Sequence, residues 1–184
     1  MLAAVAAVLL VALAVTIPLV LDQDDVDDVA RSGPVNLDDV AVYDDLDPSH
    51  TPDEVDYPQS PAVGGPHAPV WLACGVYDEP VREENAVHDL EHGTAWITYD
   101  PDADVDVDAL ASLLPENGIL SPYGDLDAPV VVTVWGRQLA LDGADDPRLP
   151  LFLDTYAGGE TAPEPFASCA GGVRSPEGIP GTTV

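Results

Sequence analysis

The chain has 184 residues, of which 34 are acidic and five basic, and its formal net charge is −29 at pH 7. It contains no lysine, and this excludes the basic patches that nucleic acids and anionic lipid headgroups require. The acids are spread along the whole chain, which is typical of a halophile's solvated surface whose self-repulsion is screened by salt. A calcium or general cation sponge is the alternative, but scattered acids usually only solvate a surface.

Residues 1–21 are apolar and uncharged, and at 1.5 Å per residue they are long enough to span a bilayer. A cleaved signal peptide is the alternative, but the apolar run continues well past the small residues Ala12 and Ala14. We therefore expect an uncleaved transmembrane anchor. The acids that follow favour an extracytoplasmic location for the rest of the chain. Residues 22–47 are predicted to be an acidic flexible tether, and residues 48–184 an extracytoplasmic α+β domain.

The domain is predicted to start with a long Pro/Gly-rich arm, because six prolines between residues 48 and 69 forbid a helix. Periodicity, capping residues and β-branched runs then predict helices at 83–90, 105–114 and 146–156 and strands at 94–99, 118–122, 129–135 and 138–141. This order predicts an α+β fold, with one small, mostly antiparallel sheet packed by two or three helices on one face. The order of the strands does not follow from the sequence.

The two cysteines, Cys74 and Cys169, are predicted to form a disulfide, because two cysteines in an oxidising compartment most often pair. The bridge would close a loop of about 95 residues, contribute about 4–5 kcal/mol in the chain-entropy model, and hold the irregular C-terminal tail. The alternative is that Cys74 serves as a metal thiolate or a nucleophile. That alternative leaves Cys169 as an unexplained thiol.

All four histidines of the chain lie within 43 residues, and this clustering favours a metal site. His88 and His92 are four residues apart, so a helix places both on one face, where they can share one ion. His67 on the arm is a candidate third ligand. Glu91 is either a fourth ligand or an orienting group, and His50 is a possible extra ligand.

Imidazole ligands suit both copper and zinc, and the only methionine, Met1, lies in the apolar segment. We favour copper, because the setting is extracytoplasmic and no catalytic base is convincingly placed. Residues 88–92 also spell H-x-x-E-H, the signature of inverted zinc peptidases, in which the glutamate is the general base. A zinc-dependent hydrolase using Glu91 is therefore an alternative, although Gly93 ends the helix at once. A metal-free structural or interaction domain is the third hypothesis.

The alternating aspartates of residues 102–108 do not fit an EF-hand, because Val107 stands at the sixth position and Leu113 at the twelfth. We expect them at the N-cap and first turn of the following helix. The chain carries no G-x-G-x-x-G, P-loop or G-x-S-x-G motif, so nucleotide binding and serine hydrolysis have no support.

Two blocks, GGPHAPVWLACGVY and VHDLEHG, together with SPYGDLDAPVVVTVWG and PEPFASC, resemble the domain of unknown function 3105 family from about His50 to Gly172. The resemblance implies a bacterial, largely actinobacterial, exported or membrane-anchored protein, and it implies no established activity. It also implies a set of typical polar positions, matched here by His50, His67, Cys74, Glu84, His88, Glu91, His92 and Cys169. The chain departs from the family pattern in its acidic surface and in having Ala62 where a second proline is common.

Overall fold

The computed structural model describes residues 34–178, and the chain divides into two units at residue 36. The predicted transmembrane anchor at residues 1–21 and the first part of the predicted tether lie outside the described residues. Within residues 34–178, no helix is both long and apolar enough to cross a membrane. Every element below belongs to the second unit.

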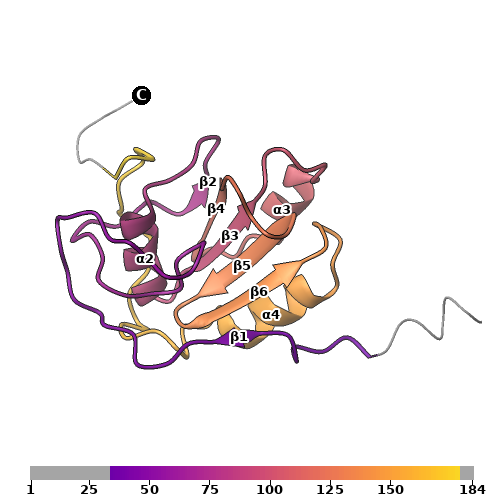
Figure 1. The fold of residues 1–184 in the computed structure, drawn as a ribbon, viewed down its shortest axis with the longest axis horizontal. Coiled ribbons are helices and arrows are strands. Elements are labelled where there is room, and N and C mark those ends of the chain that lie inside the picture. The colour runs from indigo at the N-terminus through magenta and orange to yellow at the C-terminus, as the bar shows by residue number, and fades with distance from the viewer. Residues whose placement is uncertain (1–33, 179–184) are drawn as a thin grey trace, which may run out of the picture. The chain divides into compact units, whose positions relative to one another are not determined.

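The second unit is built on a six-stranded sheet with the order β1-β6-β5-β3-β4-β2 (Figure 1). The strands are β1 (Ala41–Val42), β2 (Gly75–Val76), β3 (Ala95–Tyr99), β4 (Gly118–Pro122), β5 (Val130–Val134) and β6 (Arg137–Leu141). β4 runs parallel to both β2 and β3, and the remaining pairs are antiparallel. The sheet is therefore mixed, and the prediction of a mostly antiparallel sheet is wrong. The physical reason is the crossover between β3 and β4, because a helical connection returns the chain in the same direction.

Three helices accompany the sheet in the described part of the chain: α2 (Glu83–Glu91), α3 (Val107–Leu113) and α4 (Arg148–Tyr156). Each starts and ends within two residues of its predicted bounds, and the four longer strands agree to within one residue. The Asp106 side chain accepts a hydrogen bond from the Ala109 amide at 2.9 Å. This confirms that an aspartate of residues 102–108 caps α3.

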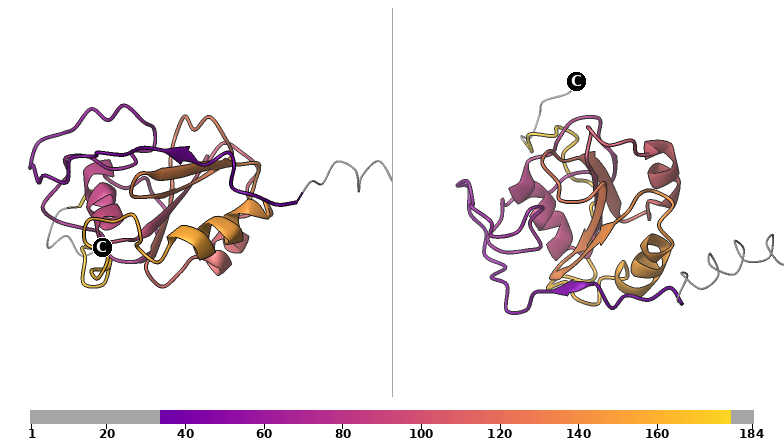
Figure 2. Two further views of the ribbon diagram at one scale, coloured as in Figure 1. Left: turned by 90° about the horizontal axis from the view of Figure 1, so that it is seen from below. Right: turned by 45° about the vertical axis from the view of Figure 1, so that its right-hand side comes forward.

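The helices cover both faces of the sheet, so the prediction that they pack on one face is wrong (Figures 1 and 2). Alternation along β3 explains this arrangement, because successive side chains point to opposite faces. Ile97 packs in an apolar cluster with residues of α3 and α4, among them Leu110 and Phe152. Trp96 packs in a second cluster with residues of α2, including Leu90.

The arm at residues 48–69 wraps over the α2 side of the sheet (Figure 2). The first two residues of α2 hold it there: Glu83 accepts a hydrogen bond from the Ala62 amide at 2.6 Å, and Glu84 accepts one from Val55 at 2.9 Å. Gly64 has φ +139°, and a Cβ there would lie 2.7 Å from Leu46 Cδ1. This position therefore requires glycine for both its conformation and its close packing.

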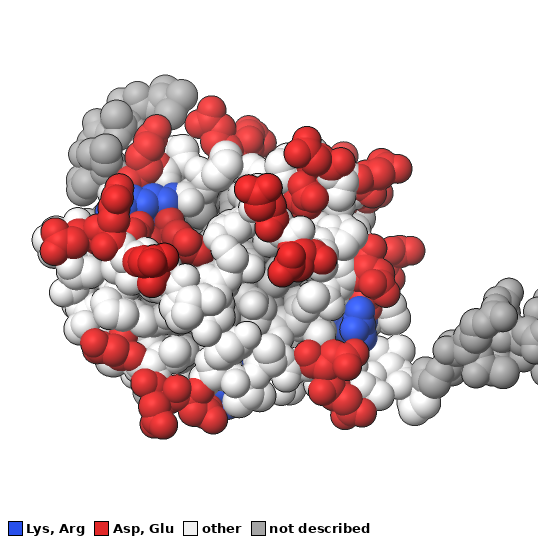
Figure 3. All heavy atoms as spheres, viewed as in Figure 1, with Lys and Arg blue, Asp and Glu red and all other residues white. Residues whose placement is uncertain are grey.

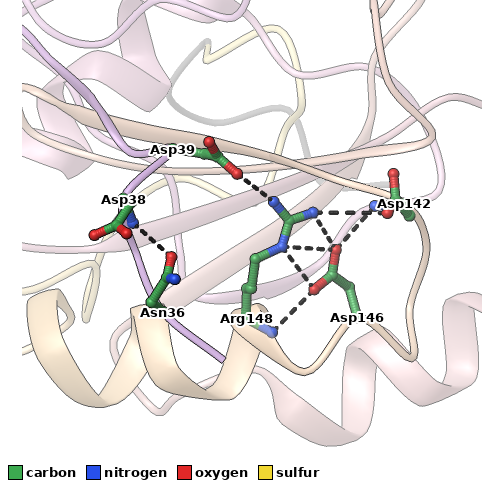
Figure 4. Close-up of polar contacts among 6 residues, drawn as sticks. All are labelled: Asn36, Asp38, Asp39, Asp142, Asp146 and Arg148. Atoms are coloured by element: carbon green, nitrogen blue, oxygen red, sulfur yellow. Dashed lines mark hydrogen bonds and ion pairs between the residues drawn. The ribbon is translucent and has the colours of Figure 1, made fainter. Parts of the chain in front are cut away.

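The folded unit also includes part of the segment predicted as a tether. β1 lies within residues 22–47 and pairs with β6, and Asp39 just before it contacts Arg148 at 3.2 Å. Arg148 also binds the buried Asp146 carboxylate at 2.6 Å (Figure 4). Hydrogen bonds from Arg148 hold the pKa of Asp146 at about 2. The acids elsewhere lie scattered over the visible face rather than gathered into one patch (Figure 3).

Candidate metal centre

Helix α2 is buried along almost its whole length, and its two sides have different chemistry. Ala86, Val87 and Leu90 join the apolar cluster against the sheet. His88 and Glu91 are also buried, with 5% and 4% of their surface exposed, although they are polar. Buried polar groups require partners, so the surroundings of this polar side must supply them.

The end of α2 places His92 beside His88. His92 is the C-cap residue, and Gly93 follows with φ +76° and donates its amide hydrogen bond to Leu90 at 3.0 Å. This agrees with the predicted glycine C-cap. A Cβ on Gly93 would lie 2.9 Å from the Cα of Gly159, so the C-terminal tail packs directly on this turn.

The arm brings His50 and His67 to the polar side of α2. The Thr51 amide donates to the His67 carbonyl at 2.7 Å, and the His67 amide donates to Ser49 at 3.0 Å. This short parallel bridge places the rings of His50 and His67 with their centroids 4.7 Å apart. The His67 side chain is fully buried, whereas that of His50 is 48% exposed.

Backbone carbonyls orient two of the imidazole rings. The His67 Nδ1 atom lies 2.8 Å from the Gly65 carbonyl, and the His88 Nδ1 atom lies 2.6 Å from the Ala68 carbonyl. A carbonyl can only accept a hydrogen bond, so both Nδ1 atoms must carry a proton. Both Nε2 atoms are therefore directed into the site as candidate ligands. Metal-binding histidines commonly show this arrangement, in which the second ring nitrogen donates to a carbonyl or carboxylate.

The Nε2 atoms of His67 and His50 converge on the Glu91 carboxylate. Its Oε2 atom lies 3.0 Å from His67 Nε2 and 3.6 Å from His50 Nε2. One ligand atom from each of His50, His67, His88 and Glu91 lies within 4.8 Å of the others. Two ligands of a tetrahedral zinc ion at 2.0–2.1 Å are about 3.3 Å apart, so the His67–Glu91 spacing suits a shared ion.

His92 lies next to this group rather than within it. Its Nε2 atom is 3.1 Å from His88 Nε2 and 3.6 Å from an oxygen of Glu164. Glu91, His92 and Glu164 form a second group with candidate ligand atoms within 4.8 Å of one another. The structure thus brings all five predicted residues together and adds Glu164. Glu164 lies in the tail, where no sequence pattern pointed to it; the predicted cysteine pairing was the only signal that the tail reaches α2.

Burial keeps the helical histidines in the form that binds metals. It lowers the pKa of His88 to about 4, and it also lowers the pKa of His92. Both rings are consequently neutral at pH 7, and neutral imidazole is the ligand form. The Trp71 ring lies beside both, with centroids 5.4 Å from His88 and 5.1 Å from His92. This indole forms part of the wall beside the two rings.

Asp89, also on α2, has a structural role rather than a place among the candidate ligands. It is fully buried, and its Oδ2 atom accepts a hydrogen bond from the Leu72 amide at 2.9 Å. Burial raises the pKa of this carboxyl well above its usual value. Asp89 therefore anchors the segment that carries Trp71 and belongs to neither candidate ligand group.

Cys74 and Cys169 form a disulfide, which confirms the predicted pairing. Cys74 is consequently neither a metal thiolate nor a nucleophile. The bridge joins the segment after Trp71 to the tail, and the Val173 amide donates to the Trp71 carbonyl at 2.9 Å beside it. The disulfide thus fixes the wall of the site and the tail that carries Glu164.

The fold and the site define a small α+β domain with a buried cluster of histidines and glutamate. A family model described as a protein of unknown function (DUF3105) matches residues 50–171, which include every candidate ligand named above. The chain belongs to this family. No curated protein and no solved structure matches the chain.

Proposed function

We propose that this chain is a membrane-anchored protein that binds a copper or zinc ion in an extracytoplasmic domain, through His50, His67, His88 and Glu91. The observation that carries the proposal is the grouping of one ligand atom from each of these four residues around a buried carboxylate. The Nδ1 atoms of His67 and His88 are committed to carbonyls, so the Nε2 atoms of both rings are left to bind an ion. The Nε2 lone pair of His67 lies 3.0 Å from the Glu91 carboxylate. This contact is unfavourable unless a proton or a cation lies between the two atoms. Three imidazoles and one carboxylate suit zinc or copper(II).

The ligand set differs from the one favoured on sequence alone. His50 takes the place of His92, because His50 lies in the group around the Glu91 oxygen, whereas His92 lies in the second group. Glu91 is close enough to be a ligand itself. This position weakens the hydrolase alternative, in which the glutamate of H-x-x-E-H is a free base.

The proposed location is supported by three features. Residues 1–21 are apolar, acids follow them immediately, and the domain contains a disulfide, which is typical of oxidising compartments. We expect the acidic surface to be solvated and screened at the high salt of a halophile's environment.

The test is metal content and affinity of the full chain, purified in detergent at high salt, for wild type and for His67→Asn and His88→Asn. Asparagine keeps a donor near the Nδ1 position, toward Gly65 or Ala68, but removes the Nε2 ligand. We expect tightly bound copper or zinc in the wild type and at least a hundredfold weaker binding in each variant, with unchanged circular dichroism. A wild type that binds neither ion would establish the metal-free structural role instead.

A further inference from the structure

The second group of candidate ligands, Glu91, His92 and Glu164, lies directly against the first and shares Glu91 with it. The His92 side chain is only 8% exposed, whereas that of Glu164 is 58% exposed. One carboxylate that belongs to two ligand groups can bridge two ions, because it offers two oxygens. The shared residue therefore raises the question of a two-ion centre.

The position of Glu164 is fixed by backbone contacts. Its amide donates to the Glu91 carbonyl at 3.0 Å, which satisfies one of the free carbonyls at the end of α2. Five residues later the chain reaches Cys169, whose amide donates to the Asn117 side chain at 3.0 Å and whose sulfur is bound to Cys74. The tail therefore delivers the Glu164 carboxylate to His92.

The His92 ring lacks a complete set of hydrogen bonds. Its Nδ1 atom is buried and makes no hydrogen bond of normal geometry among the described residues, although the Ser168 backbone is close enough to raise the pKa of the ring. If the Nε2 atom of His92 carries the ring proton, it can donate to the Nε2 atom of His88, but the Nδ1 atom of His92 is then an unpaired acceptor. If the Nδ1 atom of His92 carries the proton instead, the Nε2 lone pairs of the two rings face each other at 3.1 Å. A cation removes the repulsion in the second case, whether one ion lies between the two Nε2 atoms or a separate ion binds each. The pair of rings thus fits bound cations, and the division of the candidate ligands into two groups favours one ion on each ring.

We propose that the site holds two divalent transition-metal ions bridged by Glu91, the first bound by His50, His67 and His88 and the second by His92 and Glu164. This inference rests on the proposed function. The second ion has three protein ligands, one of them exposed, so it keeps coordination positions for water or another oxygen ligand. The two-ion arrangement is the one that hydrolytic metal centres use to hold an oxygen nucleophile.

The experiment counts zinc per chain on the full protein in detergent, after addition of zinc chloride and gel filtration at high salt, which screens binding to surface acids. The variants are Glu164→Gln and, as the matched control in the same tail, Glu160→Gln, whose exposed carboxylate belongs to neither group. We expect two zinc ions in the wild type and in Glu160→Gln, and one in Glu164→Gln. With copper(II), magnetic coupling between the two ions should disappear from the electron paramagnetic resonance spectrum of Glu164→Gln.

One ion in the wild type would overturn the two-ion centre and leave the proposed function intact. Two ions in Glu164→Gln would also overturn it, because the second site would then not need Glu164. No ion in Glu164→Gln would overturn it as well, because Glu164 would then be required at both sites. No bound ion in the wild type would refute the proposed function together with this inference.

Discussion

The face of the sheet beneath α3 and α4 is packed by aliphatic and aromatic side chains, whereas the face beneath α2 adds four histidines and buried carboxylates to its apolar cluster. On the first face, charge is kept to the rim, where Arg148 joins three aspartates (Figure 4). On the second face, ionisable side chains lie inside and depend on fixed partners. The comparison teaches that one sheet can separate an apolar part of its core from a part that holds buried ionisable side chains.

The disulfide should have the largest effect on stability. Replacing Cys74 and Cys169 by serine removes a bridge across 95 residues and should lower the free energy of unfolding by about 4–5 kcal/mol. Urea unfolding followed by tryptophan fluorescence measures this change. A reductant should lower the free energy of unfolding of the wild type to that of the double variant and should not change that of the double variant. A variant as stable as the wild type would show that the tail is held by its other contacts.

Phe152→Ala tests whether the two faces are independent. Phe152 is fully buried on the α3–α4 side, and the cavity should cost about 3–5 kcal/mol. Metal bound per folded chain should remain that of the wild type, measured at a temperature where both are folded. A loss of metal in the folded variant would mean that the faces are coupled through the sheet.

Asp146→Asn tests the rim of the same face and its dependence on pH. The pKa of Asp146 is lowered to about 2, so its ionised form stabilises the fold above its unfolded pKa near 4. This contribution, about 2 kcal/mol at neutral pH, is lost as the pH falls from about 4 through 2. Urea unfolding of the wild type and the variant should differ at pH 7 and converge near pH 2. Asp142→Asn, at an exposed position 3.8 Å from Arg148, is the control and should change little.

Glu84→Gln should have the smallest effect and act on the α2 face alone. The substitution weakens the charge-assisted bonds of Glu84 to the Val55 amide and to Arg82, at a cost of about 1 kcal/mol. Because the arm carries His50, metal affinity should fall while the stoichiometry is kept. Hydrogen exchange at Val55 and a metal competition titration measure the two effects, with Glu79→Gln as an exposed control. Unchanged exchange at Val55 would contradict this role of Glu84.

The elements that the sequence predicted are those with strong local signals. The run at residues 129–135 is β-branched, and Gly93 follows the polar helix at its end, so both could be located within a residue or two. β1 and β2 have two residues each and no periodicity. Their pairing depends on contacts far along the chain, which no local pattern encodes.

The topology and the site were predictable only in part. The strand–helix–strand order at residues 94–122 is typical of a parallel crossover, and the prediction of a mostly antiparallel sheet did not use this signal. The histidines were found by their clustering. Their division into two groups could not be predicted from the sequence. It depends on how the arm pairs Thr51 with His67 and on where the tail places Glu164.

The short strands at both ends of the sheet have a consequence for solubility in salt. At low ionic strength a net charge of −29 keeps copies of the chain apart. At 1 M salt the screening length falls to about 3 Å, and exposed sheet edges can then associate with one another. Here the outermost strands, β1 and β2, offer only two residues each for pairing with a neighbouring molecule. The fold therefore limits aggregation by the geometry of its edges under the conditions in which charge no longer does so.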